Sequence, residues 1–305
     1  MLNRRQFLKN GVLAAAGVVA SPLLSEPLWA KPRSRRLTIL HTNDMHSRIE
    51  PFPDDGGRFA NLGGMARRAS LIQRIREEEA QVLLLDAGDI FQGTPYFNFY
   101  GGELEFKLMS KMGYEVATLG NHEFDNGING FVEQLPHASF SFVNSNYDFS
   151  GSALHDSIKA FKIIHKGGIK VGVFGLGIQL EGLVARANYG PIRYQDPVAI
   201  AREMVEELNR QKCDLIICLS HLGYAYESNR ISDLKLAAQV EGIDLIIGGH
   251  THTFLDHPTE VVGPSGHMTL VNQVGWSGMR LGRVDFEFQA SGRARRTATD
   301  NLAVK

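Results

Sequence analysis

Five stretches of this 305-residue chain share a layout that few folds accommodate, in which a short apolar run leads directly into side chains able to bind metal ions. The clearest is residues 120–125, where an amide, an imidazole and two carboxylates follow the apolar run 114–119. Short apolar runs of this kind are typical of buried strands. We therefore expect five strand ends to converge on one point. The other four stretches are residues 37–46, 82–89, 215–221 and 245–252.

The rest of the chain alternates apolar runs with helical patterns, which favours an α/β fold. The spacing of apolar residues predicts helices over 62–79, 103–112, 196–211 and 232–240. Further strands are expected over 139–143, 161–165, 169–174, 268–272 and 281–288. About ten strands exceed what one compact open sheet holds comfortably. Two stacked sheets with helices outside them are therefore expected.

The first thirty residues have the features of a twin-arginine signal peptide. Arg4 and Arg5 precede a moderately apolar run over 11–20, and Ala30 ends a possible cleavage site. A transmembrane anchor is the alternative, but the run is far shorter than the ~20 residues a span needs. We expect export through the twin-arginine translocation machinery to the periplasm or medium, without stable membrane insertion. Cleaved and retained signal peptides share this pattern, so a retained signal is an alternative to cleavage after Ala30.

After a linker over residues 31–35, one catalytic domain is expected over 36–288. Residues 289–305 lose the apolar pattern and are expected to form a frayed tail. The formal net charge of −1 offers no basis for binding a nucleic acid polymer or a membrane surface.

The five stretches supply more candidate metal ligands than one tetrahedral zinc can use. Two divalent ions are therefore expected. Held ~3.5–4 Å apart, they could bind phosphate oxygens and lower the pKa of a shared water from ~15.7 towards ~7. Mixed imidazole and carboxylate ligands suit manganese, iron, zinc or cobalt without choosing among them. The candidate ligands are Asp44, His46, Asp89, Asn121, His221, His250 and His252.

Each motif alone is a weak signal, but the five in this order resemble the calcineurin-like metallophosphoesterases, and within them the 5′-nucleotidase branch. The resemblance rests on Leu-His-Thr-Asn-Asp-Met-His at 40–46, Asp-Ala-Gly-Asp at 86–89, Gly-Asn-His-Glu-Phe-Asp at 120–125, Ser-His at 220–221 and Gly-Gly-His-Thr-His at 248–252. Residues 63–67 and 190–192 extend it over roughly 36–288. It implies a four-layer α/β/β/α sandwich with a two-metal centre at the strand ends.

The resemblance also implies a division of roles within the site. Asp89 would bridge two ions, with Asp44, His46 and His252 completing the first set and Asn121, His221 and His250 the second. His122, oriented by Asp125, would face the leaving oxygen or a phosphoryl oxygen as general acid or charge stabiliser. Three further residues are expected behind these: Asp86, Glu123, which would orient a ligand histidine, and His41.

The chain departs from the nucleotidase branch in two respects. After residue 290 too little sequence follows for the C-terminal domain that holds base and phosphate in that branch, so we expect it to be absent. Ser47 also stands where the first motif often has glycine. Substrate selection is therefore expected from residues 91–100, 144–160 and 177–195, or from a partner chain.

The sequence thus predicts an exported hydrolase of phosphomonoesters, nucleotides among them, that uses attack by metal-bound hydroxide. Its substrate partner would be a small phosphate ester. Two alternatives within enzymes remain, a cyclic or diester phosphodiesterase and a hydrolase of sulfur compounds with the same two-metal site. A non-catalytic binding protein stabilised by metal ions is the third.

Overall fold

Two six-stranded sheets form the centre of the structure, a computed structural model that describes residues 35–288 and 294–305. The expected signal peptide over 1–30 lies outside these residues. The first sheet has the order β14-β13-β1-β2-β3-β4, with β1 Arg35–Thr42, β2 Val82–Asp86, β3 Val116–Ala117, β4 Ser141–Phe142, β13 Arg280–Phe288 and β14 Ala294–Ala303. The second has the order β11-β12-β10-β9-β7-β6, with β6 Phe161–Lys166, β7 Ile169–Leu176, β9 Leu215–Ser220, β10 Leu245–Gly248, β11 Thr259–Val262 and β12 Met268–Asn272.

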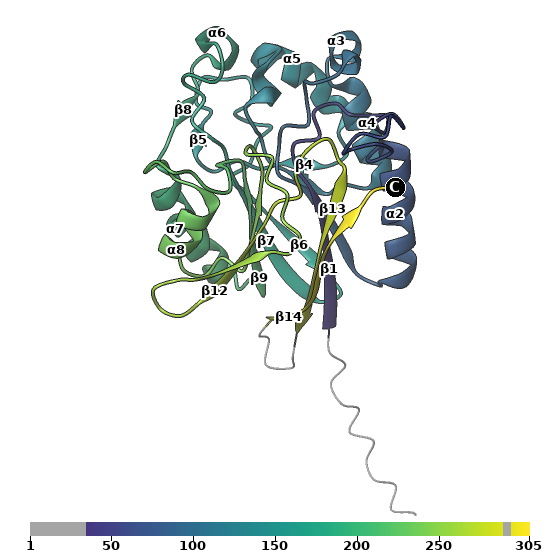
Figure 1. Ribbon diagram of the computed structural model, residues 1–305. Helices are drawn as coiled ribbons and strands as arrows, with labels where there is room; N and C mark the ends of the chain where they lie inside the picture. The colour runs from purple at the N-terminus through teal and green to yellow at the C-terminus, as the bar shows by residue number, and fades with distance from the viewer. Residues whose placement is uncertain (1–34, 289–293) are drawn as a thin grey trace, which may run out of the picture. The chain divides into compact units, whose positions relative to one another are not determined.

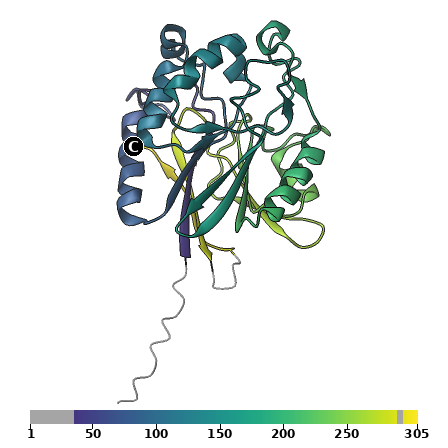
Figure 2. The ribbon, with the colours of Figure 1, turned by 180° about the vertical axis from the view of Figure 1, so that it is seen from behind.

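Helices cover the outer face of each sheet, as the ribbon shows from front and back (Figures 1 and 2). The longer helices on the first sheet are α2 Met65–Glu78, α4 Glu103–Met112 and α5 Gly127–Gln134, and those on the second are α7 Pro197–Arg210 and α8 Asp233–Gln239. Shorter elements are α3 Pro95–Tyr100, α6 Arg186–Tyr189, the 3-10 turns η1 His122–Phe124 and η2 Leu135–His137, and a small sheet of β5 Tyr147–Asp148 with β8 Arg193–Tyr194. The expected α/β/β/α sandwich is confirmed.

The alternation of side chains along a strand explains the layers. In β9, Leu215 and Ile217 pack between the two sheets, while Ile216 and Cys218 pack against α7 and α8. Successive side chains of a strand point to opposite faces, so a strand buried on both faces is apolar throughout. This is why the strands before the candidate ligands read as unbroken apolar runs.

The central strands of both sheets run parallel to their neighbours. In the first sheet β1, β2, β3 and β4 are parallel, and in the second β7, β9, β10 and β12 are parallel. Parallel strands in a sheet end at the same edge, where α/β folds place their ligand sites. In Figure 1 the helices α3, α5 and α6 lie beyond this end of the strands.

The expected frayed tail is wrong for residues 294–303, which form β14. This strand pairs antiparallel with β13 along most of its length. The chain end is also held, because Val304 donates to Met279 O and accepts from Gly63 N, both at 2.9 Å, and is fully buried. The polar composition of this segment hid a strand whose partner, β13, supplies the backbone hydrogen bonds.

Helix boundaries follow from local signals. Helix α4 has its predicted bounds and ends at Gly113, which adopts a positive φ of 75°. Helix α2 starts later than expected, since Gly64 has a φ of 94° and cannot be helical. At α7, the side chain of Asp196 accepts hydrogen bonds from two backbone amides of the first turn.

No helix in the described part of the chain has the length and apolar character needed to cross a bilayer.

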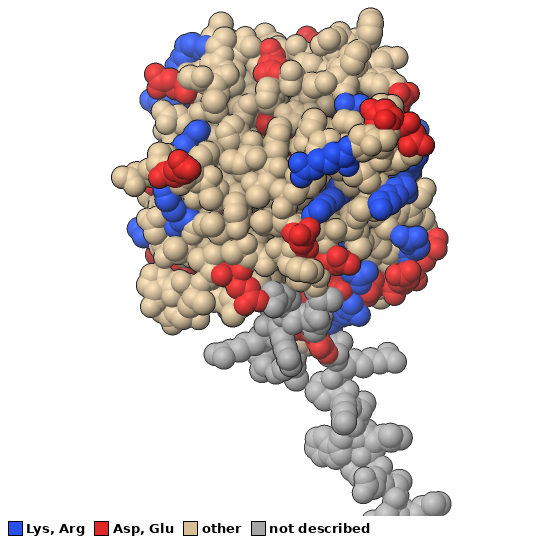
Figure 3. All heavy atoms as spheres, in the orientation of Figure 1, with Lys and Arg blue, Asp and Glu red and all other residues tan. Residues whose placement is uncertain are grey.

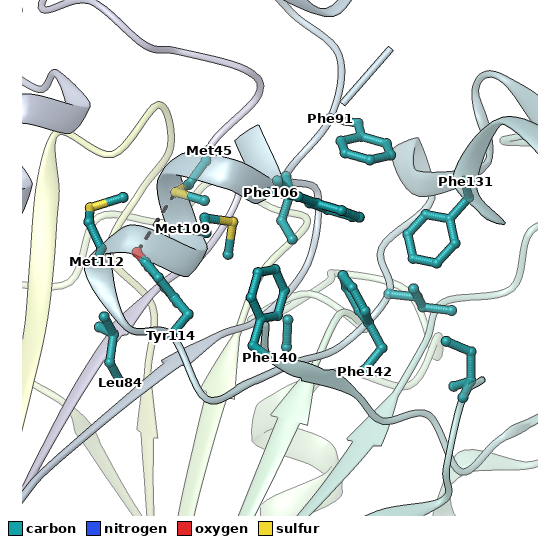
Figure 4. Close-up of a cluster of buried hydrophobic side chains, with 14 of the residues drawn as sticks. Met45, Leu84, Phe91, Phe106, Met109, Met112, Tyr114, Phe131, Phe140 and Phe142 are labelled. Carbon is teal, nitrogen blue, oxygen red and sulfur yellow. Dashed lines mark hydrogen bonds between the residues drawn. The ribbon is translucent and has the colours of Figure 1, made fainter. Parts of the chain in front are cut away.

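Aromatic side chains dominate the core between the first sheet and its helices (Figure 4). Phe106 of α4 lies at their centre, with its ring stacked on Phe91 at a centroid distance of 4.9 Å. It also contacts three other rings at 5.3–5.8 Å, those of Phe131, Phe140 and Phe142. This cluster supports the loop that follows β2 and therefore Asp89.

We predict that Phe106→Ala lowers the free energy of unfolding by about 3–5 kcal/mol, because it leaves a cavity in this cluster. Urea unfolding followed by circular dichroism measures the change. The matched control is Phe99→Ala, since Phe99 is 82% exposed and its loss is expected to cost less than about 0.5 kcal/mol. Equal effects of the two substitutions would contradict the assignment of Phe106 to a tightly packed core.

Candidate metal centre

The seven candidate ligands all lie in loops that follow strands β1, β2, β3, β9 and β10. Five of them have a left-handed backbone conformation, with φ between 48° and 71°. Residues other than glycine adopt this conformation at a cost of about 1–3 kcal/mol each. They make up half of the ten described non-glycine residues with positive φ. Strain of this kind gathers at functional sites. The five are Asp44, His46, Asp89, His250 and His252.

The first group of side chains comprises Asp44, His46 and His252, whose possible ligand atoms all lie within 4.8 Å of one another. The two Nε2 atoms of His46 and His252 are 2.9 Å apart, and His252 Nε2 is 3.5 Å from Asp44 Oδ1. Three side chains from opposite ends of the sequence thus point into one small space.

The second group comprises Asp89, His221 and His250, again within 4.8 Å. Asp89 Oδ2 is 2.9 Å from His221 Nε2, and His250 Nδ1 is 3.0 Å from Asn121 Oδ1. Asp89 also lies in a third group of the same size, with His46 and His122. Its carboxylate therefore stands between the two groups.

The donor atoms fit a divalent cation. His221 Nδ1 lies 2.7 Å from Ala87 O and so carries the proton, which leaves a lone pair on Nε2. This Nε2 is buried, and although Asp89 Oδ2 is close, the two atoms are not aligned for a hydrogen bond. His46 Nδ1 lies 3.2 Å from Gln92 O in the same way. A backbone carbonyl behind the ring is the usual support of a metal-binding histidine.

The carboxylates of the site also favour a bound positive charge. Burial lowers the pKa of His221, but the carboxylates of Asp89 and Asp44 outweigh it and raise that pKa to about 10. By contrast, burial and the neighbouring His221 lower the pKa of His250 to about 4. The negative charge of the two buried carboxylates, Asp89 and Asp44, is therefore balanced by a cation, which is either the protonated His221 imidazole or a metal ion.

His122 and Asp125 form a pair on η1 beside these groups. His122 Nδ1 lies 2.7 Å from Asp125 Oδ2, and the His122 backbone N–H donates to Asp89 Oδ1 at 2.9 Å. The imidazole is 30% exposed, so it lies at the mouth of the site. Burial lowers its pKa, but the hydrogen bond to Asp125 and the charge of Asp89 raise it to about 9.

Glu123 does not orient a ligand histidine, so that expectation is wrong. It is buried and accepts four backbone N–H groups, from Asp89 at 2.9 Å, Gly120 at 2.6 Å, Ile90 at 2.7 Å and Phe91 at 3.4 Å. Its carboxylate therefore ties the loop after β2 to the loop after β3. Backbone partners leave no signal in a sequence, which is why this role was missed.

Asp86 and His41 lie behind the site at different depths. Asp86 accepts from Thr42 Oγ1 at 2.6 Å and from Gly88 N at 2.9 Å, so it shapes the loop that carries Asp89. Burial raises its pKa to about 7. His41 is fully buried, and its Nε2 pairs with Asn272 Nδ2 at 2.8 Å, away from the candidate ligands. Burial lowers its pKa to about 3.

Two supporting residues are absent from the set predicted from the sequence. Asn43 donates to Asp44 Oδ2 and to Gly275 O, both at 2.6 Å. Gln273, at the end of β12, donates to Gly249 O and accepts from Thr253 N and from Thr251 Oγ1. Gln273 therefore fixes the loop that carries His250 and His252. Its only sequence signal was a polar residue directly after an apolar strand.

Comparisons with known proteins agree with this geometry. A family model described as calcineurin-like phosphoesterase matches residues 37–254. The chain is 39% identical over 230 residues to a snake venom 5′-nucleotidase of Gloydius brevicauda, over 73% of this chain and 38% of that protein. It is 33% identical over 287 residues to the 5′-nucleotidase of Rattus norvegicus, over 87% and 49%.

A solved structure is similar as well. The 5′-nucleotidase precursor from Thermus thermophilus superposes with a TM-score of 0.80 at 35% identity, over 88% of this chain and 55% of that one. The chain thus spans about half or less of the length of these relatives. The residues that match the family model, 37–254, include every loop that carries a candidate ligand.

We predict that Gln273→Ala weakens Mn²⁺ binding about 10–100-fold, because the loop with His250 and His252 loses its buried support. Isothermal titration of Mn²⁺ into chelator-treated protein measures the affinity. Gln239→Ala is the control, since Gln239 lies exposed on α8 and is expected to leave the affinity unchanged. Unchanged binding by a folded Gln273→Ala protein would show that this support is dispensable.

Proposed function

The chain belongs to the calcineurin-like phosphoesterase family, and we propose that it hydrolyses phosphomonoesters, nucleotides among them, with the aid of two divalent cations. The observation that carries the proposal is the position of Asp89. Its buried carboxylate lies between two groups of candidate ligands and next to the pair His122–Asp125. That is the arrangement needed to hold two cations and a proton donor around one phosphorus atom.

In this proposal Asp89 belongs to both ligand sets. Asp44, His46 and His252 complete the first, and Asn121, His221 and His250 complete the second. Manganese, zinc, iron and cobalt all suit these donors. When bound, two such cations supply Lewis-acid activation of water and of phosphoryl oxygens. Glu123 and Gln273 hold the backbone of the ligand loops, and Asn43 donates to the carboxylate of Asp44.

His122 has a separate task at the leaving group. Because Asp125 occupies Nδ1, the other ring nitrogen, Nε2, is free to face the substrate. The raised pKa keeps the ring protonated at neutral pH, so Nε2–H can donate its proton to the leaving oxygen as the ester bond breaks. A cation bound beside Asp89 would oppose this rise and bring the pKa closer to neutrality, where a general acid works best.

We predict that His122→Ala lowers kcat about 100-fold or more while Mn²⁺ affinity stays within about threefold of the wild type. Phosphate release from AMP and isothermal titration of Mn²⁺ measure the two quantities. His165→Ala is the control, because His165 is exposed on the edge strand β6, outside the site. Unchanged turnover in His122→Ala would remove the role assigned to this residue.

A panel of substrates tests the reaction itself. Wild-type protein loaded with Mn²⁺ should release inorganic phosphate from AMP and from p-nitrophenyl phosphate, and chelation should abolish the release. Turnover of bis-p-nitrophenyl phosphate or cyclic AMP alone would favour a diesterase. Turnover of a sulfur-containing substrate alone would favour a hydrolase of sulfur compounds, and absence of any turnover would favour a binding protein.

We also propose export by the twin-arginine machinery, on the strength of Arg4, Arg5 and the apolar run over 11–20. The mature protein would then act in the periplasm or the medium. Replacement of both arginines by lysine should leave the protein in the cytoplasm of a host with this machinery. Undiminished export of that variant would contradict the assignment.

A further inference from the structure

Two cavities meet at Tyr194, beside Leu222 of the loop that follows β9. The cavities have volumes of about 370 and 460 Å³, and both are lined by Gln179 and Tyr194. The first extends to Arg186 and Tyr189, and the second to Arg230. We call these two cavities together the Tyr194 groove.

A small sheet and several hydrogen bonds hold the walls of the groove in place. Most of its lining comes from residues 178–198, with Tyr147 at one end and Leu222, Arg230 and Ile231 at the other. The small sheet of β5 and β8 joins two of these segments through the pair Tyr147 and Tyr194. The Tyr147 ring is buried, and its hydroxyl donates to Ile178 O. Asn146 further fixes Gly177, through bonds of 2.9 Å to its carbonyl and 2.7 Å from its amide.

The groove connects directly to the catalytic loops. Asn188 of α6 donates to Asp125 O at 2.9 Å, so the wall of the groove is bonded to the residue that orients His122. The Tyr147 ring lies 6.1 Å from that of Phe124, in the same 3-10 turn as His122. At the other end, Leu222 lines the groove and directly follows His221. The groove therefore adjoins the loops that carry His122 and His221.

Two arginines of the groove are free to bind an anion. The guanidinium groups of Arg186 and Arg230 lie over tyrosine rings, at 4.7 Å from Tyr189 and 4.9 Å from Tyr226. Neither forms an ion pair with any residue that the structure describes.

The other charged residues of the groove are largely engaged. Arg193 pairs with Asp148 at 2.6 Å, and the carboxylate of Asp196 caps α7 by accepting from Val198 N and Ala199 N. Glu181 is exposed and lines only the cavity at the Arg186 end. The end at Arg230 therefore has an available cation and a carboxylate already bound by a helix N-terminus, where the helix dipole offsets its charge.

We propose that the Tyr194 groove holds the leaving group of the substrate and favours phosphate esters whose leaving group carries both a planar ring and a second anionic group. The inference rests on the proposed phosphoesterase function. Tyr194 supplies a ring face for stacking, and Arg230 supplies donors that can bind an anion in bidentate fashion. A nucleotide with a phosphate besides the one that is cleaved has this chemistry.

The test compares adenosine 3′,5′-bisphosphate, whose leaving group retains a ring and a second phosphate whichever ester is cleaved, with p-nitrophenyl phosphate, whose leaving group has only a ring. We predict that Arg230→Gln lowers kcat/KM for adenosine 3′,5′-bisphosphate about tenfold more than for p-nitrophenyl phosphate, mostly through KM, because a charged hydrogen bond is lost. Tyr194→Ala should lower kcat/KM for both substrates, and Tyr194→Phe should restore it. Arg202→Gln, on the exposed face of α7, is the control.

A second measurement does not depend on turnover. Isothermal titration of adenosine 3′,5′-bisphosphate into chelator-treated protein should show about tenfold weaker binding for Arg230→Gln and no change for Arg202→Gln. Equal losses of kcat/KM for the two substrates, or unchanged binding of adenosine 3′,5′-bisphosphate, would overturn the inference. If the wild type hydrolyses neither substrate, the proposed function fails, while binding of adenosine 3′,5′-bisphosphate that is lost in Arg230→Gln would still support the groove.

Discussion

The structure depends on one buried carboxylate, that of Asp89. It is only 2% exposed, and it lies between two groups of imidazoles contributed by loops from both sheets. A carboxylate removed from water is costly unless nearby charges and hydrogen bonds compensate it. Here His221 Nε2 and the backbone N–H of His122 approach its oxygens, at 2.9 Å each. Burial raises the pKa of Asp89, but the neighbouring imidazoles, His221 first and then His122 and His46, hold it well below its usual range. The surrounding loops must therefore meet at this point.

The sandwich of two sheets makes that meeting possible. Each sheet places the ends of its parallel strands at one edge, and the packed layer of Leu, Ile and Val between the sheets fixes the two edges side by side. The ligand loops then adopt left-handed backbone conformations that a short flexible loop would not keep. Buried side chains tie them down from behind, with Glu123 bonded to the loops after β2 and β3 and Gln273 bonded to the loop after β10. Side-chain packing and hydrogen bonds around these loops offset the cost of the strained backbone.

The sequence predicted the layers and the position of the site for a definite physical reason. Strands buried on both faces are largely apolar, so polar residues that follow such a run mark a strand end. Asp44, Asp89 and His221 lie two, three and one residues beyond the ends of β1, β2 and β9. What it could not predict depends on partners distant in the sequence. The four backbone amides that Glu123 accepts, the pairing of β14 with β13 and the pairing of Tyr147 with Tyr194 all join segments whose local composition is ordinary. On the face in Figure 3, charged side chains lie along the left edge and across the right half, with a largely uncharged area between them.

The most direct test of the account is anomalous diffraction from crystals of the mature protein grown with Mn²⁺. The account predicts two anomalous peaks about 3.5–4 Å apart, one on each side of the Asp89 carboxylate, the first among Asp44, His46 and His252 and the second among Asn121, His221 and His250. A single peak, or peaks that do not share Asp89, would contradict it.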